Sequence, residues 1–258
     1  MVRKPGLNFK KLYSMKINER YTSIVIASHI PDELRAKIFL TSLDSLFETT
    51  KNLPVEIIVV DNGRDLAIAA DLKDYLDEGK IQCLIHNANN MHFGFARSQG
   101  IKMAKGEYLC IADNDILFEP GWLEACWKVL EAYPKRKLYA TPIEYPTGFL
   151  KERYDNGKLM VGDIEYNLNM RAGSNCFVMR RNEFDKVGPF ACHRVAGTKW
   201  TDKAVKLGYL AAVAPGKLAK DMGLRQGYDL NQAIPIVRTL RNGETIYFNQ
   251  DEYKIPNQ

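Results

Sequence analysis

Up to residue 112, the chain alternates between short, almost wholly apolar runs and longer segments whose apolar residues recur every three or four positions. A short apolar run bounded by turn residues is typical of a buried strand, and the longer spacing is typical of an amphipathic helix. The pattern predicts strands over 23–28, 55–60, 81–85 and 107–112, and helices over 31–47, 66–76 and 93–105. Gly106 would end the last helix as its C-cap. This alternation favours a mostly parallel sheet with helices on both faces.

The second half of the chain is less regular. Helical spacing recurs over 120–133, 182–187 and 201–207, and apolar runs predict strands over 137–143, 172–180 and 209–213. Pro142, Pro146, Gly148 and Gly157 indicate a loop region between the first two of these strands. We therefore expect one large α/β domain with two halves, 21–118 and 119–225, a leader over 1–20 and a C-terminal surface extension or acceptor loop over 226–258.

Composition narrows the class of protein. Hydrophobic residues make up 46% and charged residues 26% of the 258 positions, which is typical of a soluble globular chain. The net charge of +5 is too small and too dispersed to indicate a nucleic-acid partner. No apolar run approaches the ~18 residues of a membrane-spanning helix. The basic leader lacks the centre of a secretory signal, so it is either a solvated segment or a weak dock for an anionic membrane. We expect a cytoplasmic protein with at most peripheral contact with the inner membrane face.

The number and spacing of the cysteines and histidines argue against disulfides and against a zinc site. The five cysteines are odd in number and contain no CxxC pair, so we expect buried small apolar residues in a reducing compartment. The four histidines lack the spacing of zinc ligands.

The most informative polar sequence is Asp-Asn-Asp at 113–115, which directly follows the predicted strand over 107–112. Open α/β sheets bind ligands beyond the carboxyl ends of their strands. Hard cations such as Mg²⁺ and Mn²⁺ prefer oxygen ligands and often bridge carboxylates to a diphosphate. The alternative explanation is a turn, or the N-cap of a helix that starts at Ile116. Ser28 and Asp61 also end predicted strands, so we expect all these groups at one edge of the sheet.

The order of these segments resembles the GT-A glycosyltransferases, specifically the family 2 nucleotide-sugar transferases. The matching stretches are IIVVDN at 57–62, NANN at 87–90, GFARSQGI at 94–101, AKGEY at 104–108 and GSNCFVMRR at 173–181. The resemblance covers roughly residues 21 to 223. It implies a GT-A (Rossmann-like) fold in which 21–118 binds the nucleotide sugar and 119–225 forms a smaller, irregular acceptor and catalytic half.

The resemblance also implies roles for particular residues in the donor half. Asp61 would accept a hydrogen bond from the nucleobase, with Ser28 beside it, unless Asp61 only caps the turn that follows it. Arg97 would face the diphosphate, unless it is a surface arginine. Asp113 would contact ribose or water near the metal, and Asp115 would bind Mn²⁺ or Mg²⁺ directly.

The chain departs from the family pattern at two places. The family often has a histidine before x-Gly as a further metal ligand, and here the matching residue is Asp221, which is either a metal ligand or an ordinary loop residue. The Glu-Asp pair that supplies the base in inverting members is missing. Asp202, at the predicted start of the helix over 201–207, is the candidate base, or simply an acid that favours the helix dipole. Trp200 would stack on a sugar or lie in the core.

These features predict a metal-dependent glycosyltransferase. It would move a sugar from a nucleoside diphosphate sugar, with UDP preferred, to a hydroxyl of a glycan or lipid-linked acceptor, and inversion is favoured over retention. A nucleotidyltransferase is the rival enzyme class, but the segment 28–32 lacks a Gly-rich triphosphate loop. The non-enzymatic alternative is a catalytically inactive GT-A-fold protein that binds glycans or serves as a scaffold.

Overall fold

The computed structural model describes residues 20–63, 68–143, 156–170, 173–192 and 196–222, together with the backbone of two short strands at 236–239 and 245–248. The predicted leader, except Arg20, and most of the predicted extension lie outside these residues. The helices are α2 (Glu33–Thr50), α3 (Ala69–Asp77), α4 (Phe93–Met103), α5 (Trp122–Ala132), α7 (Arg181–Val187) and α8 (Ala196–Lys206). No helix in the described part of the chain is both long and apolar enough to span a membrane.

Nine strands form one sheet in the order β3-β2-β1-β4-β9-β6-β10-β8-β7. Their bounds are β1 (Thr22–Ser28), β2 (Val55–Asn62), β3 (Cys83–Asn87), β4 (Tyr108–Ala112), β6 (Leu138–Thr141), β7 (Lys158–Val161), β8 (Ile164–Asn169), β9 (Cys176–Arg180) and β10 (Leu210–Val213). Strands β3, β2, β1 and β4 are parallel, and in this sheet β8 and β9 run against the other strands. The predicted α/β class with a mostly parallel central sheet is therefore confirmed.

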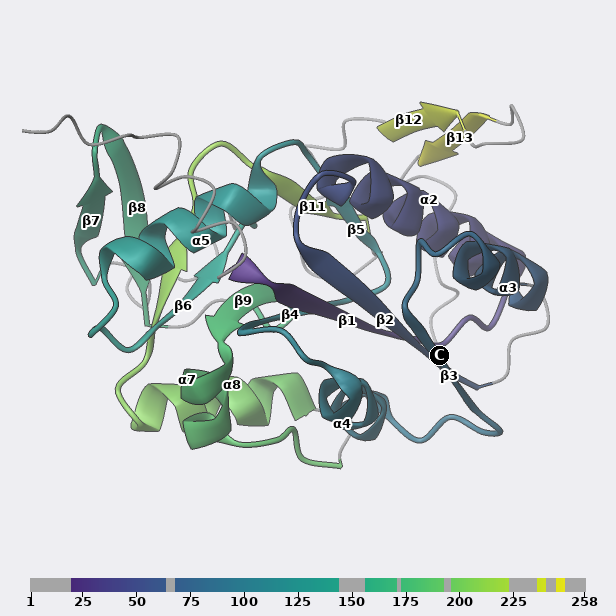
Figure 1. The fold of residues 1–258 in the computed structure, drawn as a ribbon, viewed down its shortest axis with the longest axis horizontal. Helices are drawn as coiled ribbons and strands as arrows, with labels where there is room; N and C mark the ends of the chain where they lie inside the picture. Colours follow the sequence, from purple (N-terminus) through teal and green to yellow (C-terminus); the bar gives the residue numbers. More distant parts are fainter. Residues whose placement is uncertain are drawn as a thin grey trace, which may run out of the picture.

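Helices cover both faces of this sheet, as Figure 1 shows: α2, α3 and α5 lie on one face, and α4, α7 and α8 on the other. On the first face, Phe39 of α2 and Trp122 of α5 join Ile24 of β1 in the main core. On the second face, Trp200 of α8 joins Val25 of β1 in a separate cluster. Successive strand residues point to opposite faces, so a strand buried on both faces reads as one continuous apolar run.

The junction between α4 and β4 differs from the prediction. Helix α4 ends at Met103, because Ala104 already has an extended backbone with φ −67° and ψ 136°. Gly106 is not among the residues with positive φ, so its predicted role as a left-handed C-cap is wrong. A Cβ at Gly106 would lie 2.7 Å from the carbonyl oxygen of Tyr21, so glycine is required here by the close approach of two chain segments.

Short strands account for most of the elements that the sequence pattern missed. The hairpin of β7 and β8 begins at the end of the predicted loop region, just after Gly157. Two three-residue strands, β5 (Ile116–Phe118) and β11 (Ala219–Asp221), pair antiparallel beside the Asp-Asn-Asp loop. Strands β12 (Ile236–Thr239) and β13 (Thr245–Phe248) form a further antiparallel pair.

A hydrogen bond fixes helix α7 beside the start of β10. The Tyr209 hydroxyl donates to Oε2 of Glu183 at 2.6 Å. Burial and then the hydrogen bond to Glu183 raise the pKa of Tyr209. Burial by itself would raise the pKa of Glu183, but hydrogen bonds from Lys186 and Tyr209 outweigh it, and the pKa of this carboxyl is lowered.

The cysteines are only partly as predicted. Cys110, Cys126 and Cys176 are buried, whereas Cys83 is half-buried and Cys192 is exposed. Burial raises the pKa of the Cys126 and Cys176 thiols well above the ordinary value. The prediction of buried cysteines is therefore wrong for Cys192.

Candidate functional site

The carboxyl ends of β1, β2 and β4 bring the predicted donor-site residues to one edge of the sheet. Ser28 pairs across the ladder with Asp61, and Ile26 pairs with Ala112, the residue before Asp113. Ser28 and Asp61 are both buried. The expectation that these segments share one edge is confirmed, while the roles assigned to the side chains stay predictions.

Asp61 lies within the end of β2 rather than in a turn. Strand β2 continues to Asn62, and Asp61 pairs with Ser28 on one side and His86 on the other. Nδ1 of His86 lies 2.9 Å from Oδ2 of Asp61. His86 gave no signal in the sequence, because only the register of β3 against β2 brings it to this carboxylate. A Cβ at Gly63 would lie 2.7 Å from Nδ1 of His29, so the His29 ring also borders this end of the site.

A network of side-chain amides fixes the Asn-rich loop before α4. Oδ1 of Asn62 accepts bonds from Nδ2 of Asn87 at 3.0 Å and from the backbone N–H of Met91 at 2.9 Å. Asn87 and Gln99 exchange two amide bonds of 2.8 and 3.0 Å, and Nδ2 of Asn62 donates to Asn90. Buried amides whose bonds are satisfied hold one loop conformation. The loop therefore sets where α4 begins, and with it the position of Arg97.

Arg97 is buried and bonds to the first carboxylate of the Asp-Asn-Asp loop. Its Nη2 donates to Oδ1 of Asp113, and the two side chains are 5% and 12% exposed. The guanidinium carbon lies 5.7 Å from the ring centroid of Phe93 and 5.3 Å from that of Phe190. The surface-arginine alternative is therefore wrong. A direct contact of Arg97 with a diphosphate stays a prediction, and the contact present is the one that fixes Asp113.

The second carboxylate of the loop, Asp115, pairs with a different arginine. Nη1 of Arg35, in the first turn of α2, lies 3.3 Å from Oδ2 of Asp115. The sequence signalled nothing of this pair, because its members are 80 positions apart. The next residues, from Ile116, form strand β5, so the alternative that the loop caps a helix is wrong.

Strand β11 places Asp221 beside the same loop. The backbone N–H of Met222 donates to the carbonyl of Asp115 at 2.7 Å, and Asp221 pairs with Ile116. Nδ2 of Asn175 donates to Oδ2 of Asp221 at 3.0 Å, and the carbonyl of Asn175 accepts from the Asp113 N–H at 2.6 Å. Asn175, which the sequence analysis gave no role of its own, thus links the loop to β11.

The side-chain atoms at this loop that could bind a metal ion are oxygens, the ligand type that Mg²⁺ and Mn²⁺ prefer. Among the described residues, no group of three or more His, Cys, Asp or Glu side chains has an arrangement that could hold a metal ion. Mg²⁺ commonly uses one or two carboxylates, substrate phosphates and water rather than a cage made only of protein. The site therefore fits a cation that shares Asp115 with a diphosphate, and metal ligation by Asp113, Asp115 and Asp221 stays a prediction.

Helix α8 starts earlier than predicted, which changes the position of Asp202. The helix is already formed at Ala196, so Asp202 is not in its first turn. A Cβ at Gly197 would overlap Oγ of Ser174 and lie 3.6 Å from Nη1 of Arg97, so the start of α8 abuts the donor-site arginine. Asp202 is five residues further on, about 7.5 Å along the helix axis. The predicted placement of Asp202 at a helix start is wrong, because α8 is already helical from Ala196 and Gly197 is a packing glycine inside it.

Trp200 is a core residue. Its ring stacks on Phe177 with centroids 4.7 Å apart and on Phe184 at 5.5 Å, and its indole N–H donates to the carbonyl of Gly188 at 2.9 Å. Of the two explanations offered by the sequence, the core residue is the one found, and Trp200 is not exposed for a sugar.

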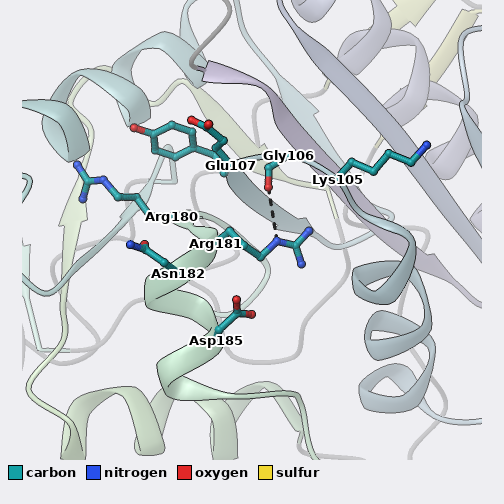
Figure 2. A pocket seen from close by; sticks show the side chains of 8 residues that line it. Lys105, Gly106, Glu107, Arg180, Arg181, Asn182 and Asp185 are labelled. Atoms are coloured by element: carbon teal, nitrogen blue, oxygen red, sulfur yellow. Dashed lines mark hydrogen bonds between the residues drawn. The ribbon is translucent and has the colours of Figure 1, made fainter.

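A hollow of about 490 Å³ lies at the opposite end of β4, where Lys105, Arg180 and Arg181 are among its lining residues. Figure 2 shows Arg181 across the middle of this hollow, bonded to the carbonyl of Gly106. The Arg181 guanidinium also donates to the carbonyls of Ile101 and Ala104 at the end of α4. These bonds satisfy the last carbonyls of a helix, so this arginine has a structural role away from the donor site.

Comparison with known families gives one extended match. The sequence model of the family described as Glycosyl transferase family 2 matches residues 23–191. An uncharacterized glycosyltransferase of Methanocaldococcus jannaschii is 28% identical over 116 residues, which cover 45% of this chain and 39% of that protein.

Solved structures share the fold at low sequence identity. A crystal structure of GalNAc-T7 with UDP, GalNAc and Mn²⁺ has a TM-score of 0.60 at 16% identity and covers 77% of this chain and 42% of its own. Staphylococcus aureus TarS 1–349 in complex with UDP-GlcNAc has a TM-score of 0.59 at 15% identity and covers 83% and 61% respectively. The chain therefore spans less than two thirds of each of these relatives.

Proposed function

The chain belongs to glycosyl transferase family 2, and from this premise we propose that it transfers a sugar from a nucleoside diphosphate sugar to an acceptor hydroxyl. Its fold is the GT-A fold, as predicted. The observation that carries the proposal is the gathering of Asp61, Asp113 and Asp115 at the carboxyl edge of one parallel sheet, where open α/β sheets bind ligands. UDP and UDP-GlcNAc in the neighbouring structures favour a UDP sugar as the donor.

The donor lies across the ends of β2 and β4 in this proposal. The Asp61 carboxylate accepts a hydrogen bond from the ring N–H of the base, and His86 orients that carboxylate from the other side. Asp113 contacts the ribose, and Arg97 holds it in place through the buried ion pair. The amide network around Asn87 keeps this surface in one conformation, which lowers the entropy lost when the nucleotide binds.

Asp115 is the residue that would hold a divalent cation, together with oxygens of the diphosphate. Such a cation would neutralise the charge that develops on the departing nucleoside diphosphate. The Mn²⁺ in the GalNAc-T7 structure supports metal use by a protein of this fold. Asp221 lies beside the same loop and is a further candidate ligand.

Asp202 is kept as the candidate base, because it is the only carboxylate on α8. From its position an acceptor would have to lie beside the middle of that helix. General-base catalysis is worth about 10²–10⁴ in rate, so Asp202→Asn is expected to lower kcat by that factor while UDP binding is kept. A kcat within about threefold of wild type would remove Asp202 from this role.

Calorimetric titration with UDP, GDP, dTDP and CDP tests the proposed function, first with Mn²⁺ and then with EDTA. The expected result is tight binding of one nucleotide, UDP, that is lost with EDTA and in Asp115→Asn. Asp163→Asn is the matched control, because Asp163 is an exposed acid in the hairpin between β7 and β8. UDP binding that survives both EDTA and Asp115→Asn would contradict metal binding by Asp115.

The position of Asp202 beyond the first turn favours a second candidate function, a GT-A protein that binds nucleotide or glycan without turnover. Release of UDP from UDP-GlcNAc and related sugars separates the two. Metal-dependent nucleotide binding without any UDP release across a panel of glycan acceptors would support the second candidate.

A further inference from the structure

The two aspartates of the Asp-Asn-Asp loop are each paired with an arginine, but the two arginines differ in how firmly they are held. Arg97 is buried between Phe93 and Phe190, and its contact with Asp113 is enclosed. Arg35 is 32% exposed, and its partner Asp115 is 14% exposed. Within the described residues, the Arg35 side chain makes a single hydrogen bond, from Nη1 to Oδ2 of Asp115 at 3.3 Å. One arginine is therefore fixed, whereas the other is able to change partner.

The place of Arg35 in α2 explains why it reaches this edge of the sheet. Asp32 is the N-cap of α2, and its side chain accepts from the backbone N–H of Arg35 at 2.8 Å. Arg35 therefore lies in the first turn of an 18-residue helix, where the partial positive charge of the helix N-terminus adds to its own. The planar guanidinium fork matches the oxygens of both carboxylate and phosphate groups.

We propose that Arg35 is a built-in counter-ion of Asp115 that a divalent cation must displace, and that the displaced guanidinium then binds the diphosphate of the donor. This inference rests on the proposed function, because it requires a metal and a diphosphate at Asp115. A cation and Arg35 compete for the same carboxylate, so the metal binds weakly to the nucleotide-free protein. The diphosphate provides a second anion for Arg35, so nucleotide and metal each strengthen the binding of the other.

The size of the competition follows from the exposure of the pair. A partly exposed ion pair with one contact is worth at most about 1 kcal/mol, which corresponds to about fivefold in an equilibrium constant. Removing the guanidinium is therefore expected to tighten Mn²⁺ binding to the nucleotide-free protein about fivefold. The same change is expected to weaken UDP binding in saturating Mn²⁺, since a charge-assisted bond to the diphosphate is lost.

The test is Mn²⁺ titration of the full chain, followed by the electron paramagnetic resonance signal of free Mn²⁺, without UDP and with saturating UDP. Arg35→Met removes the cation and keeps much of the apolar stem, whereas Arg35→Lys keeps the charge. The matched control is Lys51→Met, which removes one positive charge from the far end of the same helix, about 24 Å away. Thermal unfolding of each variant checks that α2 is intact.

The expected pattern is tighter Mn²⁺ binding in Arg35→Met without UDP, a smaller strengthening of Mn²⁺ binding by UDP, and near wild-type behaviour in Arg35→Lys and Lys51→Met. Mn²⁺ affinity in Arg35→Met equal to or weaker than in Lys51→Met would overturn the role of Arg35 and leave the proposed function standing. No Mn²⁺ binding by the wild type even with UDP would overturn the metal dependence of the proposed function, and the role of Arg35 with it.

Discussion

Breaking the buried pair of Arg97 and Asp113 by removing one partner is predicted to destabilise the chain strongly. Arg97→Met removes the guanidinium and keeps an apolar stem between Phe93 and Phe190. Asp113 is then left as a charge with little access to water, because its side chain is only 12% exposed. Removing one partner of a buried ion pair typically costs 3–5 kcal/mol, and each lost cation–π contact adds about 0.5–1 kcal/mol. Since Asp113 keeps some exposure, we expect about 4 kcal/mol in total.

Urea unfolding at pH 7 measures this loss, with fluorescence of the three buried tryptophans as the probe. Arg136→Met is the control, because Arg136 is an exposed arginine outside the site, and its cost should stay within about 0.5 kcal/mol. The double variant Arg97→Met/Asp113→Asn should cost less than the sum of its single variants by roughly 0.5–3 kcal/mol.

A different result would refute this reasoning. A cost below 1 kcal/mol for Arg97→Met, combined with a large loss of UDP affinity, would mean that Arg97 serves the diphosphate directly rather than fixing Asp113. Additive single-variant costs would mean that the two side chains do not act as a pair.

Three further predictions follow from the described contacts. Asp61→Asn should weaken UDP binding by about tenfold or more, because one charge-assisted hydrogen bond to the base is worth about 1.5–3 kcal/mol; unchanged affinity by calorimetry would remove Asp61 from the base site. Tyr209→Phe should lower the free energy of unfolding by about 1 kcal/mol at pH 7, and by less in urea unfolding at pH 3. The lowered pKa of Glu183 contributes stability above about pH 4.3, and this stability is lost as the pH falls through the pKa of Glu183 in the folded chain. A cost of Tyr209→Phe that does not change with pH would contradict this. A thiol reagent should modify Cys192 quickly and Cys83 more slowly in the native chain, and mass spectrometry that finds a third modified cysteine before unfolding would contradict the burial of the others.

The central parallel strands of the sheet were predictable from the sequence because they are buried on both faces. Strands β1, β2 and β4 are covered on both faces, so nearly every residue in them is buried and each contains an unbroken apolar run that stands out. The edge hairpin of β7 and β8 has several exposed positions, and its alternation is too weak to separate from a loop. Strands β5 and β11 have three residues each, which is too short for any period to be visible.

The candidate site was predictable as a set of positions but not as a set of contacts. The ends of strands pointed to Asp61 and Asp113, because parallel strands end at a common edge. Nothing in the spacing could show that Arg35 reaches Asp115 or that His86 reaches Asp61, since those pairs depend on helix entry and strand register. The helix start near Asp202 was misplaced, since α8 begins at Ala196 and Gly197 lies inside it, packed closely against Ser174.

A crystal structure of the chain with UDP and Mn²⁺ tests the central claim most directly. The account predicts the uracil ring against Asp61 at the end of β2, and the metal between Asp115 and the diphosphate oxygens. Nucleotide bound away from the carboxyl edge of β1, β2 and β4, or a metal held without Asp115, would contradict it.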